Sequence, residues 1–116
     1  HAMSRRQRQM CIRDRHKIKE HAFGLTLKRA GDEGGKASAT ASMFKLYGTE
    51  HNKKRHELMV AASGINGVAW DGDEFDDNDK NLTRAWLRTK GNSIEGGTSE
   101  VQLNVISKRV LGLPSQ

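Results

Sequence analysis

Cysteine, proline and aromatic residues are all scarce in this chain of 116 residues. It contains one cysteine, one proline and 5% aromatic residues. A single cysteine excludes an intramolecular disulfide and any metal site built from several cysteines. With so few aromatic side chains, the core has to be built from leucine, isoleucine, valine, methionine and alanine, and we expect it to be thin. A chain of this length supports one modest domain.

Long apolar runs are missing as well. No stretch approaches the roughly 20 apolar residues that a membrane-spanning helix needs, and no apolar segment of a secretory signal follows the basic N-terminal residues. We therefore predict a cytoplasmic protein without a membrane partner. The sequence also lacks alternating strand patterns and internal repeats, which favours an all-α fold.

The net charge of +6 comes mainly from the start of the chain. Residues 1–15 contain five arginines and one aspartate, which leaves +2 for the rest. Arginine-rich segments can contact phosphates, but this one has neither interleaved aromatic residues nor a motif that reads nucleic acid, so we expect no nucleic-acid partner. Residues 1–3 resemble a cloning remnant. We predict a basic, disordered leader over residues 1–15 and one helical domain over residues 16–116.

Four helices are predicted from the spacing of apolar residues and from helix-ending glycines. The third is expected to be capped by Asp77 or Asn78. We predict that the four helices form an antiparallel bundle. Their predicted ranges are about 14–30, 37–62, 78–90 and 100–111.

An acidic stretch after Trp70 invites comparison with a calcium-binding loop. Its six carboxylates lie between Asp71 and Asp79. A calcium loop of the helix-loop-helix type needs ligands at alternate positions and a central glycine, whereas Phe75 and Asp76 occupy its fifth and sixth positions. The histidines of the helical segments stand five residues apart, whereas two ligands on one helix face need a spacing of three or four. We therefore predict no metal site.

The most informative stretch runs from Ile94 to Pro114. Gly96 and Gly97 allow a tight turn or the close approach of a ligand. Ser99 and Gln102 can form a capping box that starts a helix directly after this turn. A glycine and then a proline end the helix, because glycine tolerates the left-handed cap and proline cannot continue the helix.

The last helix carries apolar residues around most of its circumference. A peripheral helix of a four-helix bundle is covered on one side only, so a second surface has to cover the remainder. We therefore predict that the protein forms a homodimer or homotetramer with this helix at or near the interface. The apolar residues are Val101, Leu103, Val105, Ile106, Val110, Leu111 and Leu113.

The run from Ile94 to Pro114 resembles the C-terminal signature of the acyl-CoA dehydrogenase family, flavoproteins that oxidise the Cα–Cβ bond of acyl-CoA thioesters. Residues 36–50, with small residues and the pair Lys45-Leu46, are similar to the start of that family's long helix. The resemblance covers about residues 16–114 and implies the fold of the family's C-terminal all-α domain. It also implies FAD as cofactor, acyl-CoA as substrate and a role in fatty acid metabolism. Complete members are several times larger, so we expect a truncated fragment that is incomplete as an enzyme by itself.

The resemblance also implies which residues border the cofactor and the substrate. The backbone of the glycine turn would border the flavin and the thioester, with two side chains of the next helix nearby. A second glycine turn would approach the adenine end of FAD, commonly from a neighbouring subunit, although two glycines that end a helix explain that turn equally well. These residues are Gly96, Gly97, Thr98, Glu100 and Gln102 in the first group and Gly64 and Gly67 in the second.

In many family members the catalytic base is a glutamate two residues before the threonine of the turn, where this chain has Gly96. The nearby carboxylate is Glu95, one residue earlier, which makes it the candidate base. Other members place the base on a different helix, further upstream than this chain extends. The competing interpretation of the chain is a non-catalytic helical module that associates with copies of itself.

Overall fold

The chain divides into two units, His1–Gly35 and Lys36–Gln116, and each is described by itself. The computed structural model describes residues 4–33 and 37–114. These residues form four α-helices and include no β-strand, so the predicted all-α fold with four helices is confirmed. No helix within the described ranges is long and apolar enough to cross a membrane.

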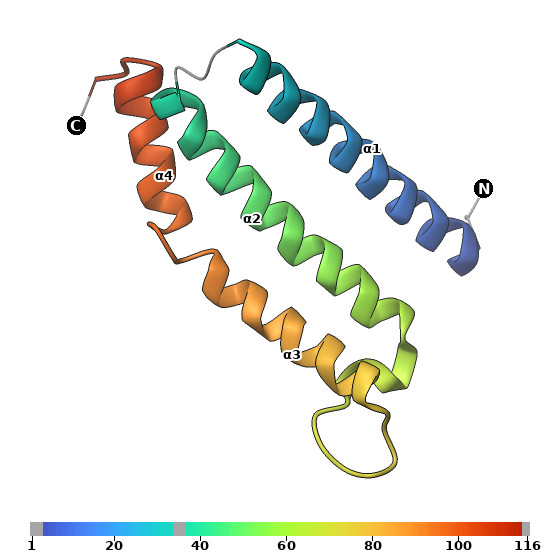
Figure 1. Ribbon diagram of the computed structural model, residues 1–116. Coiled ribbons are helices and arrows are strands. Elements are labelled where there is room, and N and C mark those ends of the chain that lie inside the picture. The colour runs from blue at the N-terminus through green and yellow to red at the C-terminus, as the bar shows by residue number, and fades with distance from the viewer. Residues whose placement is uncertain (1–3, 34–36, 115–116) are drawn as a thin grey trace. The chain divides into compact units, whose positions relative to one another are not determined.

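The first unit consists of helix α1, Arg5–Asp32 (Figure 1). It starts earlier than the predicted position near Asp14 because Ser4 and Gln7 form a capping box. The Gln7 N–H donates to the Ser4 hydroxyl at 3.2 Å, and the Ser4 N–H donates to the Gln7 side chain at 3.0 Å. None of the residues of α1 is buried. A boundary between leader and domain at residue 15 remains a prediction.

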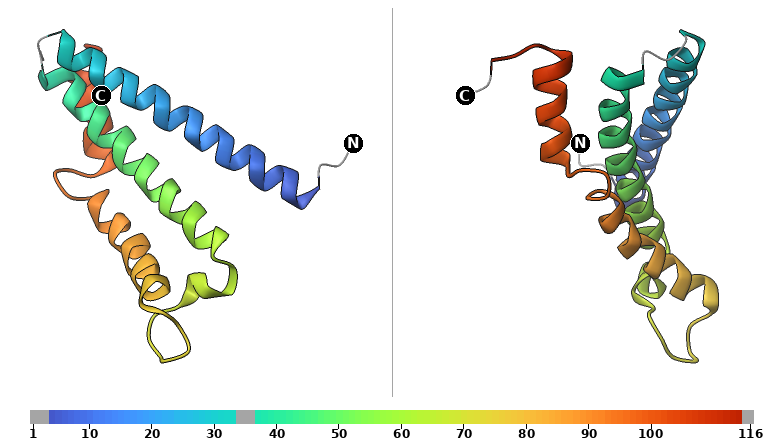
Figure 2. Two further views of the ribbon diagram at one scale, coloured as in Figure 1. Left: turned by 45° about the vertical axis from the view of Figure 1, so that its right-hand side comes forward. Right: turned by 60° about the vertical axis from the view of Figure 1, so that its left-hand side comes forward.

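Helix α2, Ala37–Ala62, contacts every other element of the second unit and has the predicted bounds. Helix α3, Asp77–Asn92, and helix α4, Ser99–Val105, both pack against it. Two further views show α3 along the second half of α2 and α4 beside its first half (Figure 2). A short 3-10 helix, η1 (Gly64–Val68), follows α2, and a π-helical turn, η2 (Ile106–Val110), continues α4.

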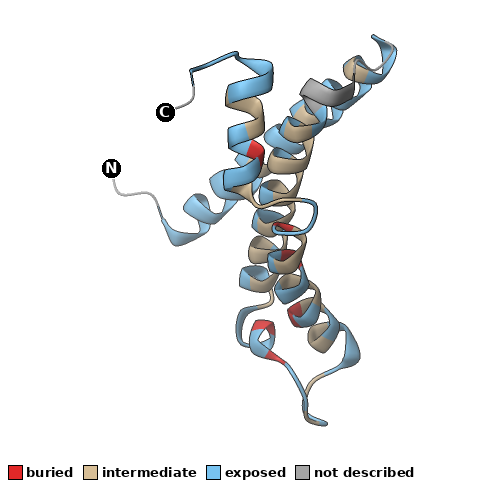
Figure 3. Ribbon diagram, turned by 90° about the vertical axis from the view of Figure 1, so that its left-hand side faces the viewer, coloured by how far each residue is buried: buried red, intermediate tan, exposed pale blue. Residues whose placement is uncertain are grey.

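The core of the second unit is thin, as the composition predicts. Ala69 is the one buried apolar residue among those that the structure describes. The other buried side chains are polar, and they lie on α3, at its C-cap and on α4 (Figure 3). Thr83 and Thr89 donate their hydroxyls to helix carbonyls, at 3.2 Å to Asp79 and 2.6 Å to Trp86. These internal hydrogen bonds offset the cost of removing the hydroxyl groups from water, so small polar residues can be buried here.

Helix α3 begins one residue earlier than predicted. Asp76 is its N-cap and accepts a hydrogen bond of 2.8 Å from the Asp79 N–H, so the predicted caps Asp77 and Asn78 lie inside the helix. Asp77 and Asp79 then place negative charge in the first turn, where the helix dipole favours it.

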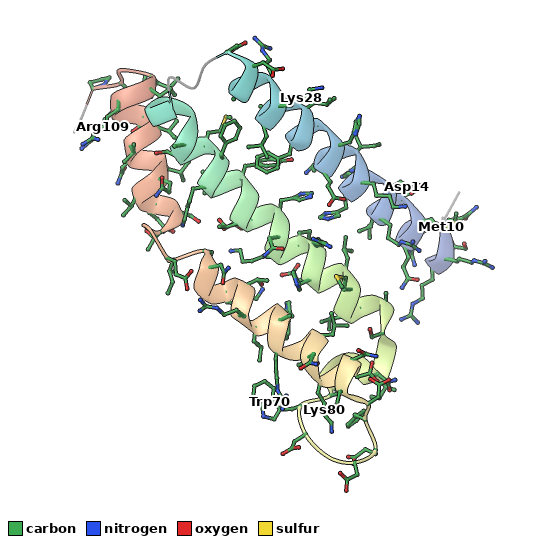
Figure 4. The ribbon with its side chains drawn as sticks, viewed as in Figure 1. Met10, Asp14, Lys28, Trp70, Lys80 and Arg109 are labelled. Atoms are coloured by element: carbon green, nitrogen blue, oxygen red, sulfur yellow. The ribbon has the colours of Figure 1, made fainter. Side chains whose placement is uncertain are left out.

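The acidic loop before α3 is anchored at its start. Arg84 donates to the Trp70 carbonyl at 3.1 Å, and its guanidinium lies 5.4 Å from the centroid of the Trp70 ring. Figure 4 shows Trp70 at the beginning of this loop and Lys80 in the adjoining part of α3. Among the described residues, no group of three or more histidine, cysteine or carboxylate side chains is placed to hold a metal ion.

The last helix ends at Gly112, as predicted. Gly112 has a φ of +63°, the left-handed conformation that commonly terminates a helix. The Leu111 N–H donates to the Ile106 carbonyl at 3.0 Å, and the Leu113 N–H donates to the Ser107 carbonyl at 2.9 Å. These wide turns satisfy carbonyls that the helix end would otherwise leave without a donor.

Candidate functional site

The predicted glycine turn joins the end of α3 to the start of α4, over residues 95–98. Gly96 has a φ of +66° and Gly97 a φ of +105°, backbone conformations that other residues rarely adopt. A Cβ at Gly97 would also lie only 2.8 Å from the Gln102 side-chain nitrogen. The conformation therefore requires glycine at position 97, and a larger residue would also have to displace the end of the Gln102 side chain.

Gly96 differs from Gly97 because it faces open space. A Cβ built on Gly96 meets no atom within 4 Å. A bound group could approach this stretch of backbone without displacing an atom of the chain, so the turn fits a cofactor at this position. Glu100, in the first turn of α4, is exposed beside it in the sequence.

The start of α4 is held by a threonine cap and by a contact to α2. Thr98 is the N-cap, and its hydroxyl accepts a hydrogen bond of 3.3 Å from the Val101 N–H. Ser99 instead donates its hydroxyl to the Glu50 carboxylate at 3.1 Å. The predicted capping box of Ser99 and Gln102 is therefore wrong, because the helix begins one residue earlier.

Two side chains hold the carbonyls of the turn. Lys45, which is half-buried on α2, donates from Nζ to the Ser93 carbonyl at 2.8 Å and also to the Gly97 carbonyl. Gln102 is buried and donates from Nε2 to the Gly96 carbonyl at 2.8 Å. Lys45 was not predicted as a site residue. The sequence signal was present in the pair Lys45-Leu46, but it indicated only the start of the long helix.

Glu50 is a second residue of α2 that contacts the turn region. A hydrogen bond from Lys53 lowers the pKa of the Glu50 carboxyl; partial desolvation opposes this effect, and the hydrogen bond from Ser99 adds to it. The Lys53 ammonium lies 2.8 Å from the Glu50 carboxylate. Glu50 therefore stays charged at neutral pH and can accept the hydrogen bond at the start of α4.

The candidate base Glu95 forms a surface ion pair. Its carboxylate lies 2.5 Å from Nη2 of Arg88, and both side chains are more than half exposed. Glu95 would have to leave Arg88 before it could take a proton from a substrate. Its assignment as the base remains a prediction.

The structure does not bring Gly64 and Gly67 to the glycine turn. Both follow the C-terminal end of α2, whereas Lys45 contacts the turn from its first half. Ala62 lies seventeen positions after Lys45 in α2, a rise of roughly 26 Å. Gly64, two residues after the end of α2, has a φ of +60°. Gly67 is buried, and its carbonyl accepts a hydrogen bond of 3.3 Å from the Thr83 hydroxyl.

Glu57 on α2 forms an ion pair with Lys90 on α3. Hydrogen bonds from Lys54 and then Lys90 lower the pKa of the Glu57 carboxyl below its ordinary value of 4.5. Each lysine lies 3.2 Å from a different carboxylate oxygen. Because the folded pKa is the lower one, the contribution to stability is present above the unfolded pKa and is lost as the pH falls through the folded pKa.

We expect Glu57→Gln to lower the free energy of unfolding by about 0.5–1 kcal/mol at pH 7, because the three side chains are about half exposed and solvent screens the pairs. Once the pH has fallen through the folded pKa, the carboxyl is protonated in both states, and the difference from the wild type should vanish. Thermal melts at pH 7 and at an acidic pH below the folded pKa measure it. The exposed Asp73→Asn is the control and should change little. An equal difference at both pH values would contradict the prediction.

Comparison with known proteins identifies the class of this domain. Residues 15–111 match the family described as "Acyl-CoA dehydrogenase, C-terminal domain". The chain therefore belongs to this family, and the prediction made from the run Ile94 to Pro114 is confirmed.

Two curated relatives are both named "Acyl-CoA dehydrogenase IpdE1". The protein of Mycolicibacterium smegmatis is 32% identical over 75 residues, and that of Mycobacterium tuberculosis is 35% identical over 75 residues. Each match covers 65% of this chain and 18% of the relative. The chain thus matches less than a fifth of the length of these relatives. No solved structure gives a significant match.

Proposed function

We propose that this chain serves as the C-terminal helical domain of a flavin-dependent acyl-CoA dehydrogenase, an enzyme that introduces a Cα–Cβ double bond into acyl-CoA thioesters. The observation that carries this proposal is the turn at Gly96 and Gly97, which combines positive φ angles, open space at Gly96 and a backbone held by α2. Membership of the family supports the same conclusion. A cytoplasmic location and a role in fatty acid metabolism belong to this proposal.

FAD is the cofactor that we propose for the glycine turn. When bound, the flavin supplies the acceptor for the substrate's β-hydride. The chain's own contribution would be the backbone that borders the flavin, with polar side chains beside it, and a carboxylate that removes the α-proton, for which Glu95 is the candidate. Gly64 and Gly67 are proposed to contact the adenine end in a neighbouring subunit. The bordering residues are Gly96, Gly97, Thr98, Glu100 and Gln102.

We expect FAD to bind the isolated chain at the glycine turn with a dissociation constant weaker than about 1 µM, because one turn supplies only a fraction of the contacts that a dinucleotide needs. Titration of the ¹⁵N-labelled chain with FAD, monitored through the amide chemical shifts, identifies the binding site and measures the dissociation constant. Shifts should be confined to residues 95–102. Sub-micromolar affinity would contradict the expected weakness, and unchanged amides at millimolar FAD would contradict the role of the turn.

Gly96→Ala is the matched variant for this titration. The added methyl would enter the open space at Gly96 and meet no atom of the chain, so the fold should survive at a strain of about 1 kcal/mol from the positive φ. The same methyl would meet an approaching ligand. The FAD-induced shifts should shrink at least about threefold, whereas an unchanged titration would place the ligand elsewhere.

A non-catalytic, self-associating module is the second candidate function, and the last helix favours it. Its apolar residues remain uncovered within the described structure: Val101 is 48%, Leu103 54% and Leu111 63% exposed. Several exposed apolar side chains on one helix are a feature of interaction sites. We propose that further copies of the chain cover them, as a homodimer or homotetramer, and the mass of the protein in solution tests this.

A further inference from the structure

One lysine holds both ends of the segment that carries the glycine turn. Lys45 on α2 donates to the carbonyl of Ser93, which is the C-cap of α3, and to the carbonyl of Gly97, next to the N-cap of α4. A cation is favourable at Ser93, because the carbonyl end of a helix carries partial negative charge. A single ammonium group therefore ties α3 and the start of α4 to α2.

The contact to Gly97 also sets the direction of a peptide group. The Gly97 carbonyl and the Thr98 N–H belong to the same peptide group, and in a trans peptide they point in opposite directions. No cis peptide bond occurs among the described residues. Because Lys45 holds the Gly97 carbonyl, the Thr98 N–H points away from Lys45.

Without this contact the peptide group would be held less firmly. Its rotation changes ψ of Gly97 and φ of Thr98, which is −64°. Glycine resists the change at position 97 less than any other residue would, whereas threonine keeps φ negative at position 98. The preceding peptide group is held separately, because Gln102 donates to the Gly96 carbonyl. The two side chains thus hold two successive carbonyls of the turn, and each fixes a different peptide group.

We propose that Lys45 is a positioning residue of the glycine turn: it fixes the Gly97–Thr98 peptide group so that the Thr98 N–H is presented as a hydrogen-bond donor on the side of the turn away from Lys45. An acceptor oxygen of a bound flavin or acyl thioester is the chemistry that this donor fits. The identity of that acceptor rests on the proposed function. The positioning itself does not.

Lys45→Met tests the proposal in the complete chain, with Lys54→Met as the matched control. Lys54 is an exposed lysine of the same helix that pairs with Glu57. In Lys45→Met, amide hydrogen exchange at residues 94, 95, 101 and 102, whose N–H groups are hydrogen-bonded on either side of the turn, should become at least about tenfold faster. The carbonyl ¹³C resonances of Ser93 and Gly97 should move upfield as they lose their donors. Amides in the middle of α3 and in the second half of α2 should keep their rates. In Lys54→Met, rates at residues 94, 95, 101 and 102 should stay within about twofold of the wild type.

Two results would overturn the proposal. One is unchanged exchange and unchanged carbonyl shifts at the turn in Lys45→Met. The other is an equal acceleration in α2, α3 and α4, which would make Lys45 a general stabiliser of the fold. If Lys45→Met does not fold, the wild type decides the question by acetylation with acetic anhydride. A Lys45 bound to two carbonyls should react at least about tenfold more slowly than Lys54, and equal rates would overturn the proposal.

The FAD titration separates this proposal from the proposed function. If FAD leaves the amides of the wild-type turn unshifted, the proposed function fails, while the exchange data still decide the role of Lys45. If the wild type shows a shift at the Thr98 amide, Lys45→Met should lose most of it. A shift of equal size in Lys45→Met would contradict the positioning role alone.

Discussion

Gly67→Ala should lower the free energy of unfolding of the second unit by about 2–3 kcal/mol. A Cβ at this buried position would lie 2.5 Å from the carbonyl oxygen of Val60 and 2.9 Å from its Cγ1. The backbone oxygen belongs to α2 and cannot move aside as the tip of a flexible side chain can. The 3-10 helix η1 would have to shift away from α2, which would also disturb the hydrogen bond from Thr83 to the Gly67 carbonyl.

For a unit of this size the expected loss corresponds to a melting temperature lower by about 10–20 °C. Circular dichroism during thermal unfolding measures it. Gly91→Ala in α3 is the control, because its new Cβ would meet only the mobile end of Arg88, at 3.2 Å. Alanine also has the higher helix propensity, so this control should change stability by less than about 1 kcal/mol. A Gly67→Ala variant that melts with the wild type would show that η1 moves freely.

The protein should sediment at micromolar concentration with at least twice the mass of the 12.9 kDa chain. The last helix and its continuation expose Val101, Leu103 and Leu111 by about half or more, and a monomer would leave these apolar side chains in water. Burying their apolar surface contributes roughly 25 cal/mol per Å² before the costs of association are subtracted. Leu111→Glu should shift the protein toward monomer, because a carboxylate in the interface would lose its hydration.

Ile65→Glu provides the matched control for self-association. Ile65 is even more exposed, at 80%, but it lies in η1 beyond the far end of α2 from the last helix. This variant should keep the mass of the wild type. A wild-type monomer at micromolar concentration, or equal dissociation by both substitutions, would refute an interface at the last helix.

The sequence by itself determined the features whose causes are local. Helix α2 has its predicted bounds, because a glycine-rich break precedes it and Gly64 follows it. The predicted turn at Gly96 and Gly97 and the predicted helix end at Gly112 are both present, and all three glycines have a positive φ. In these places a few adjacent residues decide the backbone, since glycine alone reaches such conformations without strain. The same residues carry the family resemblance, which the comparison confirms.

Helix starts were predicted less well, because several neighbouring residues could act as caps. Asp76 and Thr98 take that role, each one residue before a predicted candidate. Aspartate, asparagine, serine and threonine have similar intrinsic preferences for the N-cap. The residue that becomes the N-cap is set by the position at which the preceding loop ends and the helix begins. Packing of the helix against α2 determines that position.

Only the tertiary structure decided what holds the candidate site. Lys45 contacts the Ser93 carbonyl from 48 positions away, and Glu50 contacts Ser99 from 49 positions away. Gln102 was predicted as a neighbour of the cofactor, and the structure shows it holding the Gly96 carbonyl. The sequence does not distinguish a half-buried lysine such as Lys45 from an exposed one. The partners of Lys45 are backbone carbonyls, which every residue has, so no residue type in the sequence indicates the contact. Their positions follow from how α3 and α4 pack on α2, and no local pattern specifies that arrangement.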